Sequence, residues 1–338
     1  MSDISSIDKG LGLHVFTSFA NNGAESAPIK FMIDTGSTGF VVGSALLQPS
    51  QYQPTSETFQ LVYTSSGNKY DGIWVVTTVS FYSSENGSAV GAAVARTVPM
   101  KVRLAEKFTH GGTGKVNHHP RTVMLGVGFD RDTSPGALDP GKNPIPCGIN
   151  PFLMLEEMRT AQTMVPGFIL TPSYIKLGIT AKDRDAFEIV QLERQAPAAS
   201  LSSPSTPRWA APNVNLSVPT ANIGPMFTEF LMDTGLGYSI VQAPLGIEPP
   251  LSTVIGTIGK SRVQVADGQE VVISIPGIER PLYRYTVGTS GAPEYVLWKH
   301  NLHDGMPFVN TSMYGMGGFD YLYDDENGNL GFRFLGPE

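Results

Sequence analysis

Two stretches of the chain nearly repeat each other: residues 30–42 are KFMIDTGSTGFVV and residues 229–241 are EFLMDTGLGYSIV. A Phe, the triplet Asp-Thr-Gly and the final Val are identical in both. In each copy an apolar run leads into the triplet and another follows, the pattern of a buried strand that ends at the Asp. The copies lie 199 residues apart, which is too far for a solenoid or propeller repeat. The sequence therefore predicts an internal duplication with two similar lobes.

Short runs rich in β-branched and aromatic residues recur along the whole chain between turn residues. Gly contributes 37 and Pro 26 of the 338 residues, which favours many tight turns and hence β architecture. Residues 151–160, PFLMLEEMRT, place Phe152, Leu155 and Met158 at helical spacing and predict a short helix. We expect an all-β fold with a few short helices.

The length exceeds the roughly 250 to 300 residues at which single cores stop growing, so two lobes are expected. Residues 195–212 concentrate Pro, Ser and Ala and predict a surface connection. On this division an N-terminal lobe, residues 1–194, holds the first Asp-Thr-Gly. A C-terminal lobe, residues 213–338, holds the second.

The charge pattern limits the partners. The net charge is −7 and no basic stripe is visible, so a nucleic-acid partner is not expected. No apolar run is long enough to cross a membrane, and the first residues carry acids where a signal peptide is basic and then apolar. These features favour a cytoplasmic protein, or a secreted one if a signal has been removed.

The lone Cys147 excludes an internal disulfide and any Cys-cluster metal site. The pair His118-His119 has no third ligand at helical or hairpin spacing. We therefore expect no metal and no cofactor. Three N-glycosylation sequons begin at Asn86, Asn215 and Asn310, and they matter only if the protein is secreted.

A single Asp-Thr-Gly can be an ordinary Asx-type turn. Two copies with matching apolar flanks are more specific, and through them the chain resembles the pepsin-like aspartic peptidases, of the disulfide-free kind. The resemblance spans nearly the whole chain. It implies a bilobal, pepsin-like double-β-barrel fold in which Asp34 and Asp233 are the catalytic pair.

The resemblance also implies supporting roles around the pair. Thr35 and Thr234 would form hydrogen bonds between the lobes, Gly36 and Gly235 would allow the turns that present the carboxylates, and Ser37 would donate to Asp34. A β-hairpin flap would carry Tyr63, with its tip at Ser65, Ser66 and Gly67.

Two further segments resemble parts of the family. Residues 123–128, VMLGVG, are similar to the apolar segment that threads beside the first catalytic loop, with a counterpart expected near residues 313–315. Residues 319–334 are similar to the closing hairpin, with a tight turn at Asn327-Gly328.

Peptide hydrolysis needs a base to deprotonate water and an acid to polarise the carbonyl group. Two Asp side chains within about 3 Å cannot both ionise comfortably, so they share one proton. The expected function is an aspartic endopeptidase that acts as a monomer on extended peptides or proteins. The alternative is the same fold used as a non-proteolytic enzyme on a small metabolite, or as a binding module.

One departure from the family concerns the second triplet, which is followed by Leu236 where the family has a hydroxyl residue. A donor stabilises an ionised carboxylate, and an apolar neighbour does the reverse. The sequence therefore predicts that Asp233 holds the shared proton and that Asp34, supported by Ser37, is the ionised base.

Overall fold

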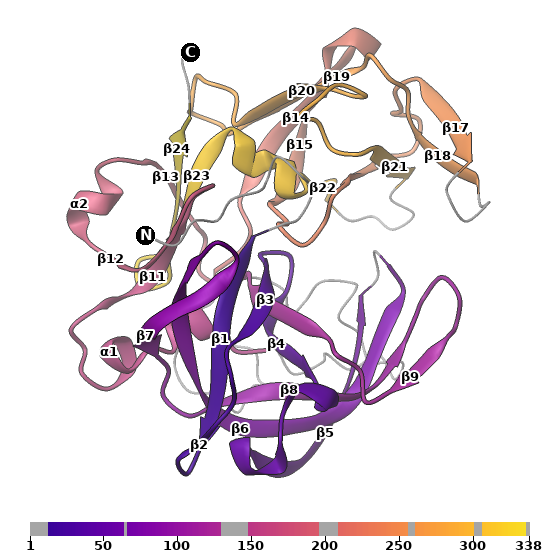
Figure 1. The fold of residues 1–338 in the computed structure, drawn as a ribbon. Helices are drawn as coiled ribbons and strands as arrows, with labels where there is room; N and C mark the ends of the chain where they lie inside the picture. The colour runs from indigo at the N-terminus through magenta and orange to yellow at the C-terminus, as the bar shows by residue number, and fades with distance from the viewer. Residues whose placement is uncertain are drawn as a thin grey trace.

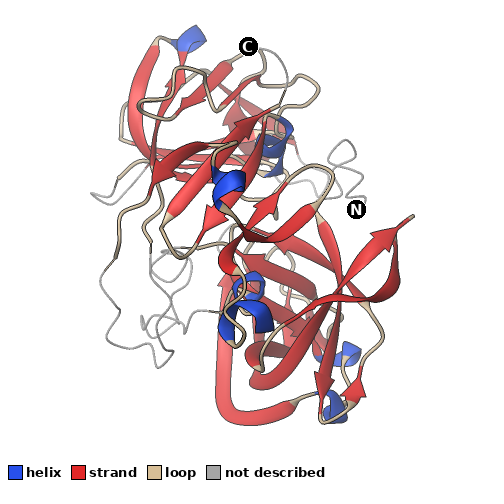
Figure 2. Cartoon of the chain, turned by 90° about the vertical axis from the view of Figure 1, so that its left-hand side faces the viewer, coloured by secondary structure: helices blue, strands red, loops and turns tan. Residues whose placement is uncertain are grey.

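The computed structural model describes residues 13–63, 66–129, 148–195, 209–255, 261–300 and 306–335. These residues form mainly strands, arranged in two lobes (Figure 1), and the helical segments are short (Figure 2). The predicted all-β architecture is confirmed. Ser65, Cys147 and residues 196–208 of the proposed connection lie outside the described residues.

The N-terminal sheet closes on itself. Its strands follow the order β1-β3-β10-β4-β8-β6, and β6 pairs back with β1, so the ring has no open edge. The ring strands are β1 (His14–Asn21), β3 (Ile29–Asp34), β4 (Thr38–Gly43), β6 (Asn68–Glu85), β8 (Met100–Thr109) and β10 (Val123–Val127). Strands β2 (Ala24–Glu25), β5 (Gln53–Tyr63), β7 (Ser88–Arg96) and β9 (Val116–His118) pair with β1, β6, β6 and β8.

The C-terminal lobe contains a sheet with the order β20-β19-β14-β15-β22-β16-β21. A separate hairpin of β17 and β18 lies beside β21 (Figure 1). The bounds are β14 (Asn213–Val218), β15 (Ile223–Leu231), β16 (Ser239–Ala243), β17 (Leu251–Ile255), β18 (Ser261–Val265), β19 (Glu270–Ser274), β20 (Tyr283–Thr286), β21 (Val296–His300) and β22 (Phe308–Asn310).

A third sheet joins the two halves of the chain, with the order β12-β11-β23-β24-β13. Strands β11 (Val165–Leu170), β12 (Ile175–Ile179) and β13 (Glu188–Gln191) come from the first half, and β23 (Phe319–Asp324) and β24 (Asn329–Phe334) from the end. The predicted closing hairpin is confirmed, because β23 and β24 pair antiparallel around Asn327-Gly328. The proposed lobe boundary remains a prediction, since this sheet draws on both sides of it.

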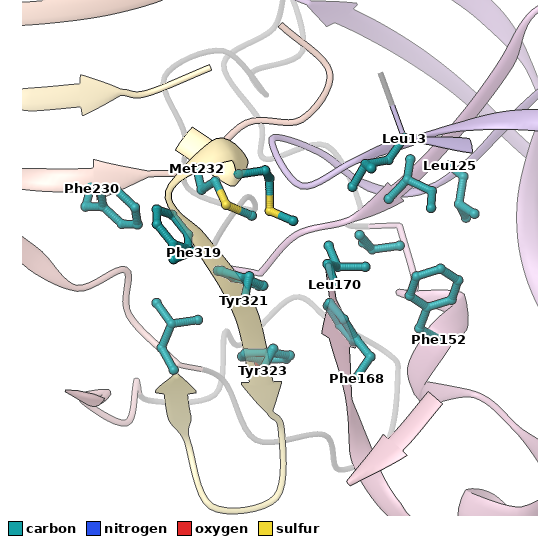
Figure 3. Close-up of a cluster of buried hydrophobic side chains, with 14 of the residues drawn as sticks. Leu13, Leu125, Phe152, Phe168, Leu170, Phe230, Met232, Phe319, Tyr321 and Tyr323 are labelled. Atoms are coloured by element: carbon teal, nitrogen blue, oxygen red, sulfur yellow. The ribbon is translucent and has the colours of Figure 1, made fainter. Parts of the chain in front are cut away.

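One hydrophobic core runs through both lobes. Figure 3 shows its central part, with Leu125 and Phe152 on one side and Phe230, Met232 and Tyr321 on the other. Apolar positions on either side of each Asp-Thr-Gly are buried in this core, among them Phe31, Ile33, Phe40, Val42, Phe230, Met232 and Val241. The core therefore holds the ends of β3 and β15 in place.

The helix expected over residues 151–160 is interrupted. The segment forms a 3₁₀ turn, Pro151–Leu153, and a one-turn helix, α1 (Glu156–Arg159). Leu155 between them has an extended backbone and forms a β-bridge with Thr97. The three apolar residues that suggested the helix are all buried: Phe152, Leu155 and Met158. A second short helix is α2 (Ala181–Arg184).

Candidate active site

Each Asp-Thr-Gly follows a strand that is held on one side by a parallel neighbour. In the N-terminal lobe β10 pairs parallel with β3, with Gly126 opposite Asp34, and antiparallel with β4. In the C-terminal lobe β22 pairs parallel with β15 and antiparallel with β16. The expected counterpart of β10 near residues 313–315 is therefore wrong. Those residues form a 3₁₀ helix, Met313–Gly317, and β22 takes the place of β10.

The two triplets are bound to each other by a reciprocal set of hydrogen bonds. The Thr35 N–H donates to Thr234 Oγ1 at 3.1 Å, and the Thr234 N–H donates to Thr35 Oγ1 at 3.0 Å. The Thr35 hydroxyl donates to the Met232 carbonyl at 2.6 Å, and the Thr234 hydroxyl to the Ile33 carbonyl at 2.8 Å. Both threonines are buried, so these bonds fix the relative position of the two loops.

This arrangement brings the carboxyl groups of Asp34 and Asp233 together, and a side-chain hydrogen bond joins them. One oxygen of each carboxyl accepts a backbone N–H from within its own triplet. Gly36 donates to Asp34 Oδ1 at 2.7 Å, and Gly235 donates to Asp233 Oδ1 at 2.9 Å. Two carboxyl groups in hydrogen-bond contact share a proton, because both cannot carry charge at this separation.

The glycines serve a different purpose from the one expected. Neither Gly36 nor Gly235 has a positive φ angle, so the turns do not require glycine for their conformation. Instead each lies against the opposite carboxyl group. A Cβ at Gly36 would stand 2.6 Å from Asp233 Oδ1, and a Cβ at Gly235 would stand 2.7 Å from Asp34 Cγ. The absence of a side chain is what lets the carboxyl groups meet.

The second oxygens of the two carboxyl groups have different donors. Ser37 Oγ donates to Asp34 Oδ2 at 2.5 Å, from the same loop. Asn310 Nδ2, at the end of β22, donates to Asp233 Oδ2 at 2.6 Å. Leu236 therefore does not leave Asp233 without a donor, and the expectation that Asp233 holds the shared proton loses its basis.

The sequence does not identify Asn310 as a site residue. It marks the residue only as the start of a sequon, yet Asn310 is buried, with 4% of its surface exposed. A signal was present in the sequence, since a short apolar strand at residues 308–309 ends in a side chain that can donate. Its meaning depends on the pairing of β22 with β15, which joins residues far apart in the chain.

The electrostatics of the pair are unequal. Asp34 is 4% exposed, whereas Asp233 is half-buried. Burial, and after it the charge of Asp233, raise the pKa of Asp34 to about 8, against the opposing effects of the Ser37 and Gly36 bonds. These effects favour the protonated form of Asp34.

Tyr63 lies at the end of β5, in a hairpin with β6 in which it is opposite Asn68. Its ring packs edge-on against Tyr70 at 5.8 Å between centroids. Burial, followed by the charge of Asp34, raises the pKa of the Tyr63 phenol, and a hydrogen bond links it to Ser37. Tyr63, Ser37 and Asp34 thus form a connected polar chain.

At the described part of the hairpin tip, Gly67 has a φ of +70°, and its N–H donates to the Tyr63 carbonyl at 2.7 Å. Ser66 is exposed beside it. The neighbouring loop supports the tip, because the Gly111 N–H donates to Asn68 Oδ1 at 3.1 Å.

On the other side of the pair, Tyr238 stacks on Tyr295 with 4.5 Å between ring centroids and 12° between planes. The Arg262 guanidinium lies 3.3 Å from the centre of the Tyr295 ring. Burial, then Tyr295 and Asp233, raise the pKa of Tyr238 to about 12. Tyr238 therefore stays a neutral hydroxyl beside Asp233 over the ordinary pH range.

Over the described ranges, no group of three or more His, Cys, Asp or Glu side chains is arranged to hold a metal ion. In the same part of the chain no helix is long and apolar enough to span a membrane.

Comparison with known proteins supports the fold alone. The aspartic proteinase from Irpex lacteus superposes with a TM-score of 0.54 at 13% sequence identity, covering 97% of this chain and 96% of that one. No protein-family model and no curated protein matches the chain. The predicted bilobal, pepsin-like fold is thus confirmed.

Proposed function

We propose that this protein is an aspartic endopeptidase in which Asp34 and Asp233 activate a water molecule. The observation that carries the proposal is the contact between the two carboxyl groups, held by reciprocal Thr35 and Thr234 bonds and by a glycine beneath each. A binding module has no need of two carboxyl groups that share one proton. Such a pair is costly to bury and is typical of acid–base chemistry.

The reaction follows from one shared proton. The ionised carboxylate takes a proton from water while the water oxygen bonds to the peptide carbonyl carbon, and the protonated carboxyl gives its proton to the carbonyl oxygen. The resulting gem-diol loses its C–N bond as a proton passes to the nitrogen. That proton comes from the pair, which takes another from a gem-diol hydroxyl, so that a carboxylic acid and an amine leave and the pair again holds one proton.

The β5–β6 hairpin is proposed as a flap. Tyr63, Ser66 and Gly67 would cover a bound peptide. Exposed backbone groups at such a tip pair readily with an extended chain. Tyr63 would also hold Ser37 in the position from which it donates to Asp34. Because both halves of the pair come from one chain, a monomer suffices for activity.

The test is cleavage of an unbiased peptide mixture at several pH values, with and without a statine-type transition-state mimic. Asp34→Asn and Asp233→Asn should each remove nearly all activity and leave the fold intact, since members of one catalytic unit fail together. Folding is checked by circular dichroism and thermal unfolding. Wild-type cleavage by either variant would place the chemistry elsewhere. Folded protein that cleaves nothing would favour the non-proteolytic alternative.

A further inference from the structure

The surroundings of Asn310 fix its side-chain amide in one orientation, in which it donates a hydrogen bond to Asp233. Its strand, β22, is paired on both sides, and its own carbonyl accepts the Ser239 hydroxyl at 2.6 Å. The Ser312 N–H donates to Asn310 Oδ1 at 2.9 Å. Because a backbone N–H can only donate, the amide oxygen must face Ser312, and the amide nitrogen must face Asp233.

Ser312 adopts an unusual backbone to make that bond. Its φ of 64° and ψ of −177° fall in a region that residues other than glycine rarely occupy. The residue is fully buried, so the conformation is imposed by its surroundings. The strained turn directs its N–H at the Asn310 amide and fixes the orientation of that side chain.

The donor to Asp34 is of another kind. A serine hydroxyl can donate to a carboxylate or turn and accept from a carboxylic acid. Ser37 therefore suits Asp34 in either protonation state, and Tyr63 offers it a second partner. The Asn310 amide nitrogen can donate but cannot accept a hydrogen bond, so it suits only a carboxyl oxygen without a proton.

We propose that Asn310 is a positioning residue that keeps Asp233 ionised, so that Asp34 holds the shared proton. The inference rests on the proposed function for its catalytic meaning: Asp233 takes the proton from water, and Asp34 protonates the carbonyl oxygen. Greater exposure of Asp233 acts in the same direction, because solvent stabilises charge. The assignment reverses the one that the sequence suggests.

Tyr63 interacts electrostatically with Asp34, Tyr238 interacts with Asp233, and further charged or titratable groups interact with these two tyrosines. Within the described residues all of these groups come from β5, β8, the loop after the second triplet, β18 and the segment before β21, and are Tyr63, Arg103, Tyr238, Arg262, Tyr295 and Glu294. None is altered in the variants below. They therefore do not affect the comparison of one variant with another.

The pair loses two protons in sequence, and each donor should affect a different step. If Asp233 ionises first, Asn310 stabilises the singly charged state, and its removal raises the lower apparent pKa. The upper step is then the ionisation of Asp34, and removal of Ser37 raises the upper apparent pKa. If Asp34 ionised first, the two effects would be exchanged.

The experiment measures kcat/KM against pH for the wild type, Asn310→Ala and Ser37→Ala. Asn310→Ala should move the acid limb upward by about one pH unit and leave the alkaline limb in place, a shift expected from the loss of one bond to a charged group. Ser37→Ala should move the alkaline limb upward. The exchanged pattern, or no shift with Asn310→Ala, would overturn the proposal.

A second readout does not require activity. The infrared band of protonated carboxyl groups is titrated in the same variants, using Asn215→Ala as a control that changes a half-buried asparagine of the same sheet. Asp325, whose pKa burial raises to about 6, contributes equally to every spectrum and cancels in the differences. A shift in the infrared titration without peptide cleavage would refute the proposed function and leave the proton assignment standing.

A rescue variant separates donation from folding. In Asn310→Ala/Leu236→Thr a hydroxyl is restored three residues after Asp233, the spacing at which Ser37 serves Asp34. The lower apparent pKa should return towards the wild-type value. If Asn310→Ala does not fold, Asn310→Val, which suits a strand better, carries the same expectation. Failure of rescue in folded protein would contradict a donor role for Asn310.

Discussion

The outer oxygen of each carboxyl group, Oδ2, accepts a hydrogen bond from a different kind of donor. Asp34 Oδ2 accepts from Ser37, three residues further along the same loop, whereas Asp233 Oδ2 accepts from Asn310 on another strand. Around these donors the two loops match closely, down to the Thr bonds and the glycine N–H bonds. The backbone frame is therefore the part that the two loops share. The outer donor can be supplied from elsewhere, provided that it reaches the same oxygen.

The strands next to the two loops explain why the donor to Oδ2 comes from different places. Met124 on β10 pairs with Met32 and Val41, and Asn310 on β22 pairs with the corresponding Leu231 and Ile240. Met124 packs its side chain against an apolar cluster that includes residues of the β5–β6 hairpin. At the same place in the second lobe a polar side chain faces the carboxyl group. The two lobes therefore differ at two positions, with Ser37 in place of Leu236 in the loops and Met124 in place of Asn310 on the paired strands.

By the same strand register, Gly126 of the first lobe and Ser312 of the second lobe occupy equivalent positions. A Cβ at Gly126 would stand 2.6 Å from the Ser37 backbone, so only glycine fits there. Ser312 has a positive φ angle, which Gly126 does not have, and it carries a side chain, at a cost of order 1–3 kcal/mol. The second loop therefore stores strain that the first does not.

The largest expected effect on activity comes from adding a methyl group at a glycine that contacts a carboxyl group of the pair. Gly36→Ala and Gly235→Ala should each reduce kcat/KM by about 100-fold or more, because the carboxyl groups must separate by about 1 Å. The two should differ in stability. Gly36→Ala displaces the half-buried Asp233, whereas Gly235→Ala displaces Asp34, which has no room to move, and should also lower the free energy of unfolding.

Gly224→Ala is the matched control for both variants. It lies on β15, which leads to Asp233, and a Cβ there meets no atom within 4 Å. Activity should stay at the wild-type level. Near-normal activity in Gly36→Ala would show that the carboxyl contact is not needed for catalysis.

A smaller effect is expected from Thr35→Val and Thr234→Val. Each removes one hydroxyl that both donates and accepts across the lobes, and leaves a buried N–H and a buried carbonyl without that partner. Each variant should lose about 1–3 kcal/mol of unfolding free energy in urea denaturation. The losses should be similar, because the bonds are reciprocal, and the double variant should lose less than their sum.

Thr253→Val on the exposed hairpin of β17 and β18 provides the reference, and should change stability by less than about 0.5 kcal/mol. If Thr35→Val and Thr234→Val behaved like this control, the bonds between the triplets would not stabilise the molecule. Strongly unequal losses would contradict the equivalence of the two loops.

The sequence predicts those parts of the site that lie within a few residues of each triplet. Asp34, Thr35 and Ser37 could be placed because an apolar strand entering Asp-Thr-Gly fixes the direction of the chain on both sides. Tyr63 could be placed because a hairpin needs only local pairing and a turn with Gly67. Asn310 could not, because its role depends on strand pairing across 77 residues.

The reason why Gly36 and Gly235 must be glycine also could not be predicted from the sequence. A glycine in a turn first suggests a positive φ angle, whereas these two allow a carboxyl group from the opposite loop to approach. The requirement comes from a contact between loops, and no window of the sequence around one loop contains it. The same holds for the proton, whose position depends on the burial of Asp34 and the donor of Asp233.

The smallest expected effect is that of Leu236→Thr in an otherwise unchanged chain. From the triplet alone, a hydroxyl at this position should lower the pKa of Asp233 and move the alkaline limb of kcat/KM to lower pH. Asp233 Oδ2 already accepts from Asn310 at 2.6 Å, however, so a second donor competes for one oxygen. Both limbs should shift by less than about 0.3 pH unit, because a bond that replaces an existing one adds little. The measurement is the pH profile of Leu236→Thr beside that of Asn310→Ala/Leu236→Thr. A drop of a full unit in the alkaline limb of the single variant would mean that Asn310 does not donate to Asp233, and that the two loops depend on the same position for their outer donors.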